Sequence, residues 1–149
     1  MILIADGGST KVDWIALSNS KNEVFRIQTK GINPSVISKN EIIERITCCT
    51  KLISIKNEVT EIHFYGAGCG TPEPIVILRN VLEQIFKNAA IYIAEDMLAA
   101  VKATTGDKPA IVCILGTGSN SCFFDAKKIK KLRPSSGYTL REEVKGERA

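Results

Sequence analysis

The segment Asp6-Gly7-Gly8-Ser9-Thr10-Lys11 carries residue types that suit the binding of a phosphate group. Two glycines let the backbone turn sharply and approach a ligand closely. Consecutive N–H groups, together with the Ser9 and Thr10 hydroxyls, form a cradle for an anion. Lys11 adds positive charge, and Asp6 can hold Mg²⁺, usually through water. An ordinary glycine hairpin turn remains the alternative interpretation of this segment taken alone.

A second hydroxyl-bearing glycine turn, Gly116-Thr117-Gly118-Ser119-Asn120, also lies between two predicted strands. It suits the other side of a polyphosphate, although a plain hairpin is again the alternative. Two such turns on strand pairs favour a polyphosphate ligand more strongly than either turn alone.

Asp96 follows a predicted strand and precedes a predicted helix. A carboxylate at such a junction can accept a proton from a sugar hydroxyl while that hydroxyl attacks a γ-phosphate. Asp is also a favoured residue at the N-terminus of a helix, so an ordinary helix cap is the competing interpretation.

The hydrophobic pattern predicts the elements that must position these residues. Short strands are predicted at 1–5, 12–17, 23–29, 61–65 and 90–94, with turn-rich segments between the first three. Helical spacing of apolar residues predicts helices at 38–56, 72–87 and 97–104. A strand pair at 110–115 and 121–124 follows. This order predicts an α/β fold in which helices pack on a mixed sheet, with a domain over 1–108 and the start of another over 109–149.

Composition and charge narrow the class of protein. The chain has 149 residues, 44% of them hydrophobic and 24% charged, which is typical of a globular protein. Residues 126–149 hold eight basic and three acidic residues, whereas residues 1–125 hold twelve and thirteen. A basic tail on a neutral body does not indicate a nucleic-acid binder. We interpret the basic run 127–133 as a solvated loop.

The sequence also predicts a cytoplasmic location without membrane contact. No apolar run is long enough to span a bilayer, and the start reads as a strand rather than a signal peptide. The odd count of five cysteines indicates buried structural residues in a reducing compartment. The adjacent pair Cys48-Cys49 is expected on the apolar face of a helix.

Five segments together resemble one known family. They are DGGSTKVDW (6–14), GINPS (31–35), GAGCG (66–70), AEDMLAA (94–100) and ILGTGSNS (114–121). In this order they resemble the BadF/BadG/BcrA/BcrD-type ATPases of the sugar kinase, Hsp70 and actin superfamily, and within it N-acetylglucosamine kinase. The resemblance covers roughly residues 1–138. It implies a ribonuclease H-like, actin-like ATPase domain that uses ATP and Mg²⁺ to phosphorylate N-acetylglucosamine or glucosamine at the 6-position.

The resemblance implies a role for each matching residue. Asp96 would be the catalytic base, and Asp6 would associate with Mg²⁺. The remaining residues fall into a group that contacts nucleotide phosphates and a group that contacts the sugar. The phosphate group is Gly8, Ser9, Thr10, Lys11, Gly116 and Thr117, and the sugar group is Asn33, Gly118 and Asn120.

The chain departs from the family pattern in two ways. Roughly twice this length is expected for the two domains that close on the nucleotide, and residues 141–149 do not continue the family pattern. We therefore expect an incomplete form, arising from a frameshift, a premature stop or a shortened expression product, with weak or absent turnover. Unpaired sheet edges after about Pro109 predict a mobile tail or a homodimer formed through exposed apolar surface.

Three other functions remain open from the sequence. A Rossmann-type dinucleotide binder would use the glycine-rich segment 66–70, although its spacing is not G-x-G-x-x-G. An ATPase that activates a dehydratase would need cysteines such as Cys69 or Cys113 for a shared iron–sulfur cluster. A non-catalytic module would bind sugar or nucleotide without turnover.

Overall fold

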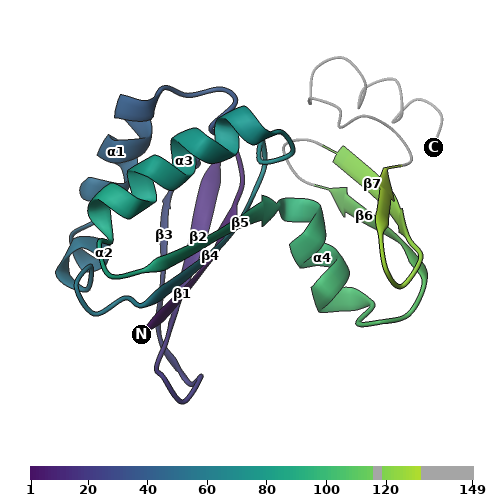
Figure 1. The fold of residues 1–149 in the computed structure, drawn as a ribbon, viewed down its shortest axis with the longest axis horizontal. Coiled ribbons are helices and arrows are strands. Elements are labelled where there is room, and N and C mark those ends of the chain that lie inside the picture. Colours follow the sequence, from purple (N-terminus) through teal and green to yellow (C-terminus); the bar gives the residue numbers. More distant parts are fainter. Residues whose placement is uncertain (116–118, 132–149) are drawn as a thin grey trace. The chain divides into compact units, whose positions relative to one another are not determined.

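The chain divides into two compact units in the computed structural model, which describes residues 1–115 and 119–131 (Figure 1). The first unit is Met1–Asp96, and the second begins at Met97. The domain boundary expected after residue 108 stays a prediction.

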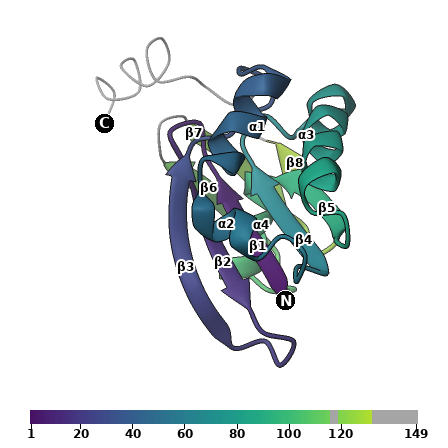
Figure 2. The same cartoon turned by 90° about the vertical axis from the view of Figure 1, so that its left-hand side faces the viewer.

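A mixed five-stranded sheet forms the centre of the first unit. Its strands are β1 (Ile2–Gly7), β2 (Lys11–Leu17), β3 (Glu23–Lys30), β4 (Glu61–Gly66) and β5 (Ala90–Glu95). They lie in the order β3-β2-β1-β4-β5, which Figure 2 shows side by side. The pairs β1–β2 and β2–β3 are antiparallel, and the pairs β1–β4 and β4–β5 are parallel. The mixed sheet predicted from the sequence is confirmed.

Helices α1 (Lys39–Thr47), α2 (Thr50–Ser54) and α3 (Pro72–Ile85) belong to the same unit. The single helix predicted over 38–56 is wrong in one respect, because the chain breaks between α1 and α2. Cys49 is extended at φ −85° and ψ 96°, and it lies among threonine and cysteine residues with low helix propensity. Cys48 is exposed rather than packed on an apolar face.

The core of the first unit lies on the face of the sheet that α1 and α3 cover. Alternate residues of β1, β2 and β4 are buried there, because successive strand side chains point to opposite faces. The ring of Trp14 packs edge-on against Phe64, with centroids 5.8 Å apart. The largest fully buried side chains of this core are Leu3, Trp14, Ile32, Ile42, Ile46, Leu52, Ile62, Phe64, Leu78, Leu82 and Phe86.

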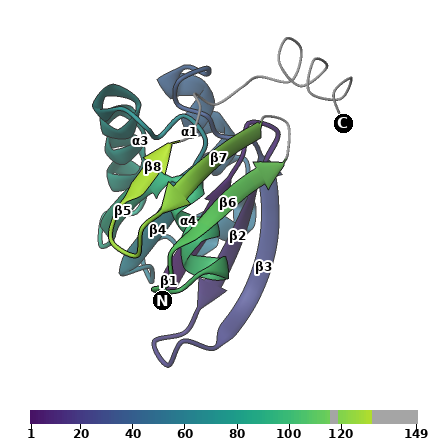
Figure 3. The same ribbon diagram turned by 90° about the vertical axis from the view of Figure 1, so that its right-hand side faces the viewer.

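The second unit is built around a three-stranded antiparallel sheet. Strands β6 (Ala110–Leu115), β7 (Ser119–Phe124) and β8 (Ile129–Lys131) lie in that order (Figure 3). Helix α4 (Asp96–Thr104) precedes them, and its residues pack with the sheet in a small core of Met97, Val101, Val112 and Cys122. The loop expected over 127–133 is corrected in part, because Ile129–Lys131 pairs with β7. No helix among the described residues has the length and apolar character needed to cross a bilayer.

Candidate functional site

Four chain segments of the first unit meet at one edge of its sheet. Strands β1, β3, β4 and β5 run in the same direction, so their carboxyl ends lie together. The turn 8–10, the loop 31–35, the loop 67–70 and Asp96 follow these four ends. Ligands of α/β sheets typically bind outside the carboxyl ends of strands. The strand topology therefore brings the residues predicted at 6–11, 33 and 96 to a common edge.

The turn between β1 and β2 is closed by a hydrogen bond from the Gly8 N–H to the Lys11 carbonyl, at 2.8 Å. The side chains of Asp6, Ser9, Thr10 and Lys11 are exposed around it. This turn thus presents one carboxylate, two hydroxyls and one ammonium group to solvent. The binding of an anion by this turn stays a prediction.

Asp13 was not predicted as a site residue, yet it shapes the charge of this turn. It lies opposite Asp6 in the β1–β2 register. Its carboxylate accepts from Gln28 Nε2 at 2.6 Å and pairs with Lys11 Nζ at 3.3 Å. The hydrogen bond from Gln28, with a smaller contribution from Lys11, lowers the pKa of Asp13 below its ordinary value. Asp13 therefore stays charged and holds Lys11 beside the turn.

The residues after β3 clasp the turn from its other side. The Gly31 N–H donates to the Thr10 carbonyl at 2.8 Å, and the Ile32 N–H donates to the Gly8 carbonyl at 3.1 Å. A Cβ at position 31 would stand 2.0 Å from the Ser9 carbonyl oxygen, so only glycine permits this approach. The carbonyls of the turn are thus engaged by the loop 31–35.

The side chain of Asn33 joins three loops. Its Nδ2 donates to Ser9 Oγ at 3.0 Å, and its Oδ1 accepts from the Ser35 N–H at 3.0 Å. Ser35 Oγ in turn donates to the Gly68 carbonyl at 2.9 Å. Gly68 has φ +77°, and a Cβ there would lie 2.0 Å from Asn33 Oδ1. Sequence reasoning missed Ser35 and Gly68 in this role, because neither residue type alone signals such contacts.

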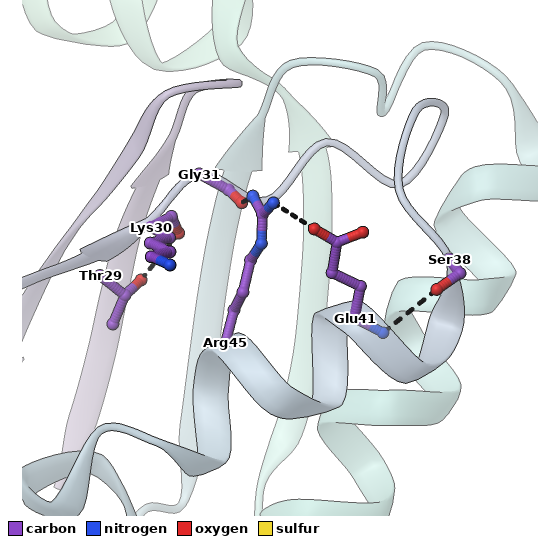
Figure 4. A network of polar contacts seen from close by, with 6 residues as sticks. All are labelled: Thr29, Lys30, Gly31, Ser38, Glu41 and Arg45. Carbon is purple, nitrogen blue, oxygen red and sulfur yellow. Dashed lines mark hydrogen bonds and ion pairs between the residues drawn. The ribbon is translucent and has the colours of Figure 1, made fainter.

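Arg45 of α1 anchors the same loop from below. Its guanidinium donates to the Gly31 carbonyl and pairs with Glu41, and Figure 4 shows it between these two partners. The hydroxyl of Ser38 accepts from the Glu41 N–H at 3.2 Å and caps the helix. The helix that carries Arg45 is therefore tied to the residue that contacts the turn.

The loop after β4 closes the edge toward β5. The Ala67 N–H donates to the Gly7 carbonyl at 2.8 Å. The Cys69 side chain is buried, and its burial, followed by the charges of Asp96 and Glu95, raises the pKa of its thiol to about 12. The Cys69 thiol is therefore neutral at ordinary pH. Its electrostatic interaction with Asp96 indicates that this carboxylate lies near the loop 66–70.

The other predicted residues lie elsewhere in the chain. Gly116, Thr117 and Gly118 fall outside the described residues. Asn120 lies on β7 of the second unit, where its Oδ1 accepts from the Ser121 N–H at 2.9 Å. The first unit accordingly brings together the predicted residues Asp6, Gly8, Ser9, Thr10, Lys11, Asn33 and Asp96.

The exposed carboxylate of Asp6 suits a magnesium ion that arrives with a nucleotide. Mg²⁺ keeps several water ligands and is usually bound through one or two carboxylates and substrate phosphates. Among the described residues there is no group of three His, Cys, Asp or Glu side chains that could hold a metal. The donor set therefore fits a nucleotide-borne ion better than one held by the protein alone.

Comparison with solved structures identifies proteins of the same architecture. A protein from Porphyromonas gingivalis, provisionally described as an N-acetylglucosamine kinase, aligns over 94% of this chain with 42% identity and a TM-score of 0.83. The chain belongs to the superfamily of sugar kinases and actin-like ATPases. No family model matches this actin-like chain, and neither does any curated protein.

Two more distant structures support the fold of this actin-like chain. A Chromobacterium violaceum protein, also provisionally described as an N-acetylglucosamine kinase, aligns over 87% of it with 12% identity and a TM-score of 0.67. The ethanolamine utilization protein EutJ from Carboxydothermus hydrogenoformans aligns over 98% with 13% identity and a TM-score of 0.62. The predicted ribonuclease H-like fold is thus confirmed. The chain spans about half of these relatives, namely 50%, 47% and 56% of their lengths.

Proposed function

We propose that this chain forms the phosphate- and sugar-binding part of an ATP-dependent sugar kinase whose acceptor is N-acetylglucosamine. The observation that carries the proposal is the meeting of the turn after β1, the loop 31–35 and Asp96 at one sheet edge. The 42% identity to the Porphyromonas gingivalis protein supports this acceptor. Glucosamine is the alternative acceptor.

In the proposed reaction, a sugar hydroxyl, taken to be the 6-hydroxyl, attacks the γ-phosphorus of ATP. A new bond forms between this oxygen and phosphorus, while the bond to the departing ADP oxygen breaks. The carboxylate of Asp96 receives the hydroxyl proton as a general base. Such a reaction requires positioning and charge neutralisation more than covalent help from the protein.

The turn 6–11 would neutralise and orient the transferred phosphate. Gly8, Ser9, Thr10 and Lys11 would contact the β- and γ-phosphates, and Asp6 would orient the water shell of Mg²⁺, which neutralises phosphate charge when bound. Outside this turn, Gly116 and Thr117 would hold phosphate, and the proposed sugar contacts are Asn33, Gly118 and Asn120.

Coupled ATP turnover with N-acetylglucosamine and Mg²⁺ tests the proposal on the wild-type chain and on Asp96→Asn. Loss of a general base typically lowers the rate by about 10²–10⁴-fold. The matched control is Asp107→Asn, at an exposed position outside the proposed site. We expect the weak turnover of this chain to fall by this factor in Asp96→Asn and to be preserved in Asp107→Asn. Equal turnover in the wild type and Asp96→Asn would contradict the assignment of the base.

The non-catalytic alternative gives a different result in the same experiment. Binding of Mg·ATP and sugar without turnover in any variant would indicate a non-catalytic module. For the dehydratase-activating alternative, Cys69 is buried whereas the other candidate cysteine, Cys113, is exposed and so remains accessible to a partner chain. Iron bound by protein purified without air would favour this alternative, and absence of iron would argue against it.

A further inference from the structure

The hydrogen bonds of Asn33 suggest that it orients the proposed phosphate-binding turn 6–11 (the phosphate turn) as well as contacting a sugar. The Ser35 N–H is only a donor, so the Asn33 atom that faces it at 3.0 Å must be the carbonyl oxygen Oδ1. The amide orientation follows from this contact, and it places Nδ2 at 3.0 Å from Ser9 Oγ. Asn33 is therefore the donor in its bond with Ser9.

The direction of this bond determines what the Ser9 hydroxyl can do. A hydroxyl group has one hydrogen to donate and two lone pairs that accept. Since Ser9 Oγ accepts from Asn33, its own hydrogen remains available for another partner. Ser9 is exposed in the turn that follows β1, which is the turn proposed to bind phosphate. A donor hydrogen on Ser9 suits a phosphate oxygen, which can only accept.

We propose that Asn33 is a positioning residue that orients the Ser9 hydroxyl as a hydrogen-bond donor to a nucleotide phosphate. This inference rests on the proposed kinase function and deepens it. Asn33 keeps one N–H hydrogen and one lone pair of Oδ1 beyond its two bonds, so contact with a sugar remains possible. The loop 31–35 would then link the phosphate-binding and sugar-binding parts of the site.

The neighbouring loop prevents Asn33 from turning away. Ser35, which donates its N–H to Asn33 Oδ1, is itself tied to the Gly68 carbonyl at 2.9 Å. Gly68 lies so close to Asn33 Oδ1 that a Cβ would stand 2.0 Å away. Both neighbours thus hold the Oδ1 end of the Asn33 amide, as expected for a residue that orients another.

Calorimetric titration with a non-hydrolysable ATP analogue and Mg²⁺, in the absence of sugar, tests this inference. The proteins are the full wild-type chain, Asn33→Ala, Ser9→Ala and the double variant, with Asn80→Ala as the control on the exposed side of α3. Loss of one hydrogen bond predicts an affinity about three- to tenfold lower in Asn33→Ala. The double variant should bind no more weakly than Ser9→Ala, because Asn33 acts through Ser9.

A residue that contacts only sugar would give a different pattern. Unchanged nucleotide affinity in Asn33→Ala, with only the KM for sugar raised, would overturn the inference and leave the kinase proposal intact. Fully additive losses in the double variant would also overturn it. Failure of the wild-type chain to bind the Mg²⁺ complex of the analogue would refute the proposed function, and the inference with it. Asn80→Ala should bind like the wild type.

Discussion

Cys69 is a buried, uncharged side chain that lies near the carboxylates of Asp96 and Glu95. The side chain is 2% exposed, and its Sγ lies 3.9 Å from the Ala67 carbonyl oxygen. Burial disfavours the thiolate, and the carboxylates of Asp96 and Glu95 disfavour it further, so the pKa rises to about 12. Cys69 therefore fills the loop after β4 as a small neutral group.

We predict that Cys69 makes the folded chain less stable at alkaline pH. In the unfolded state the thiol loses its proton near its ordinary pKa of 9.0, whereas the folded state keeps it to about 12. The unfolded state then binds fewer protons, so the free energy of unfolding falls as pH rises above 9, by at most about 1.4 kcal/mol per unit.

Urea unfolding between about pH 8 and about pH 10.5 checks this prediction, because this range spans the ordinary thiol pKa of 9.0. The decline should be shallower in Cys69→Ala than in the wild type. Cys48→Ala is the control, since this cysteine is exposed and should leave the decline unchanged. Identical pH dependence in the wild type and Cys69→Ala would contradict the assignment.

Helix α1 illustrates how a helix that packs on the sheet can hold the loop 31–35 in place. Ser38 caps its N-terminus, and Glu41 and Arg45 form an ion pair along the helix. The Arg45 guanidinium also donates to the Gly31 carbonyl (Figure 4). Ile42 and Ile46 of the same helix are fully buried in the core. The helix thus connects the core to the loop 31–35, which contacts the turn between β1 and β2.

We predict that Arg45→Ala lowers the free energy of unfolding by about 1–3 kcal/mol, because a charged hydrogen bond to a backbone carbonyl is lost. Urea unfolding measures this change. Glu41→Gln is the matched comparison, since it removes the ion pair and leaves the contact with Gly31. Its cost should stay below about 1 kcal/mol, because Glu41 is partly exposed. A loss in Glu41→Gln as large as the loss in Arg45→Ala would contradict the prediction, because the ion pair would then account for the whole effect.

At the scale of the whole molecule, the part of the second unit that the structure describes has fewer buried core residues than the first unit. Four buried residues form its core, and alternate residues of β6 are exposed on the opposite face of that strand. Ile111 is 67% exposed and Leu115 is 87% exposed. Apolar residues arranged in this way favour association with another surface. A homodimer through this face remains our proposal for the full chain.

Sedimentation velocity over a range of concentrations tests the homodimer. We expect the wild-type chain to self-associate and Leu115→Lys to shift it toward the monomer, because a charged side chain is costly in an apolar interface. Val76→Lys is the control, since Val76 is an exposed apolar residue of α3 in the first unit, 53% exposed. A wild-type chain that stays monomeric at every concentration would contradict the proposal, as would association unaffected by Leu115→Lys.

Local patterns predicted much of the first unit but not its finer breaks. The strands, the glycine turn after β1 and the position of Asp96 at the end of β5 follow from alternation, turn residues and spacing. The break at Cys48-Cys49 was missed because apolar spacing continues across it. Strand β8 was missed because its lysines indicate solvent exposure, whereas edge strands tolerate such residues on their open side.

The sequence by itself determined which residues are candidates for a phosphate-binding turn and a general base, because glycine, hydroxyl and acidic residues express their chemistry locally. The tertiary structure alone decided how these groups are oriented. Asn33 donates to Ser9 across 24 residues, and Arg45 reaches Gly31 across 14. Such contacts depend on the strand order that brings four carboxyl ends to one edge. No local pattern encodes them, since each requires two distant segments to be placed within hydrogen-bond distance.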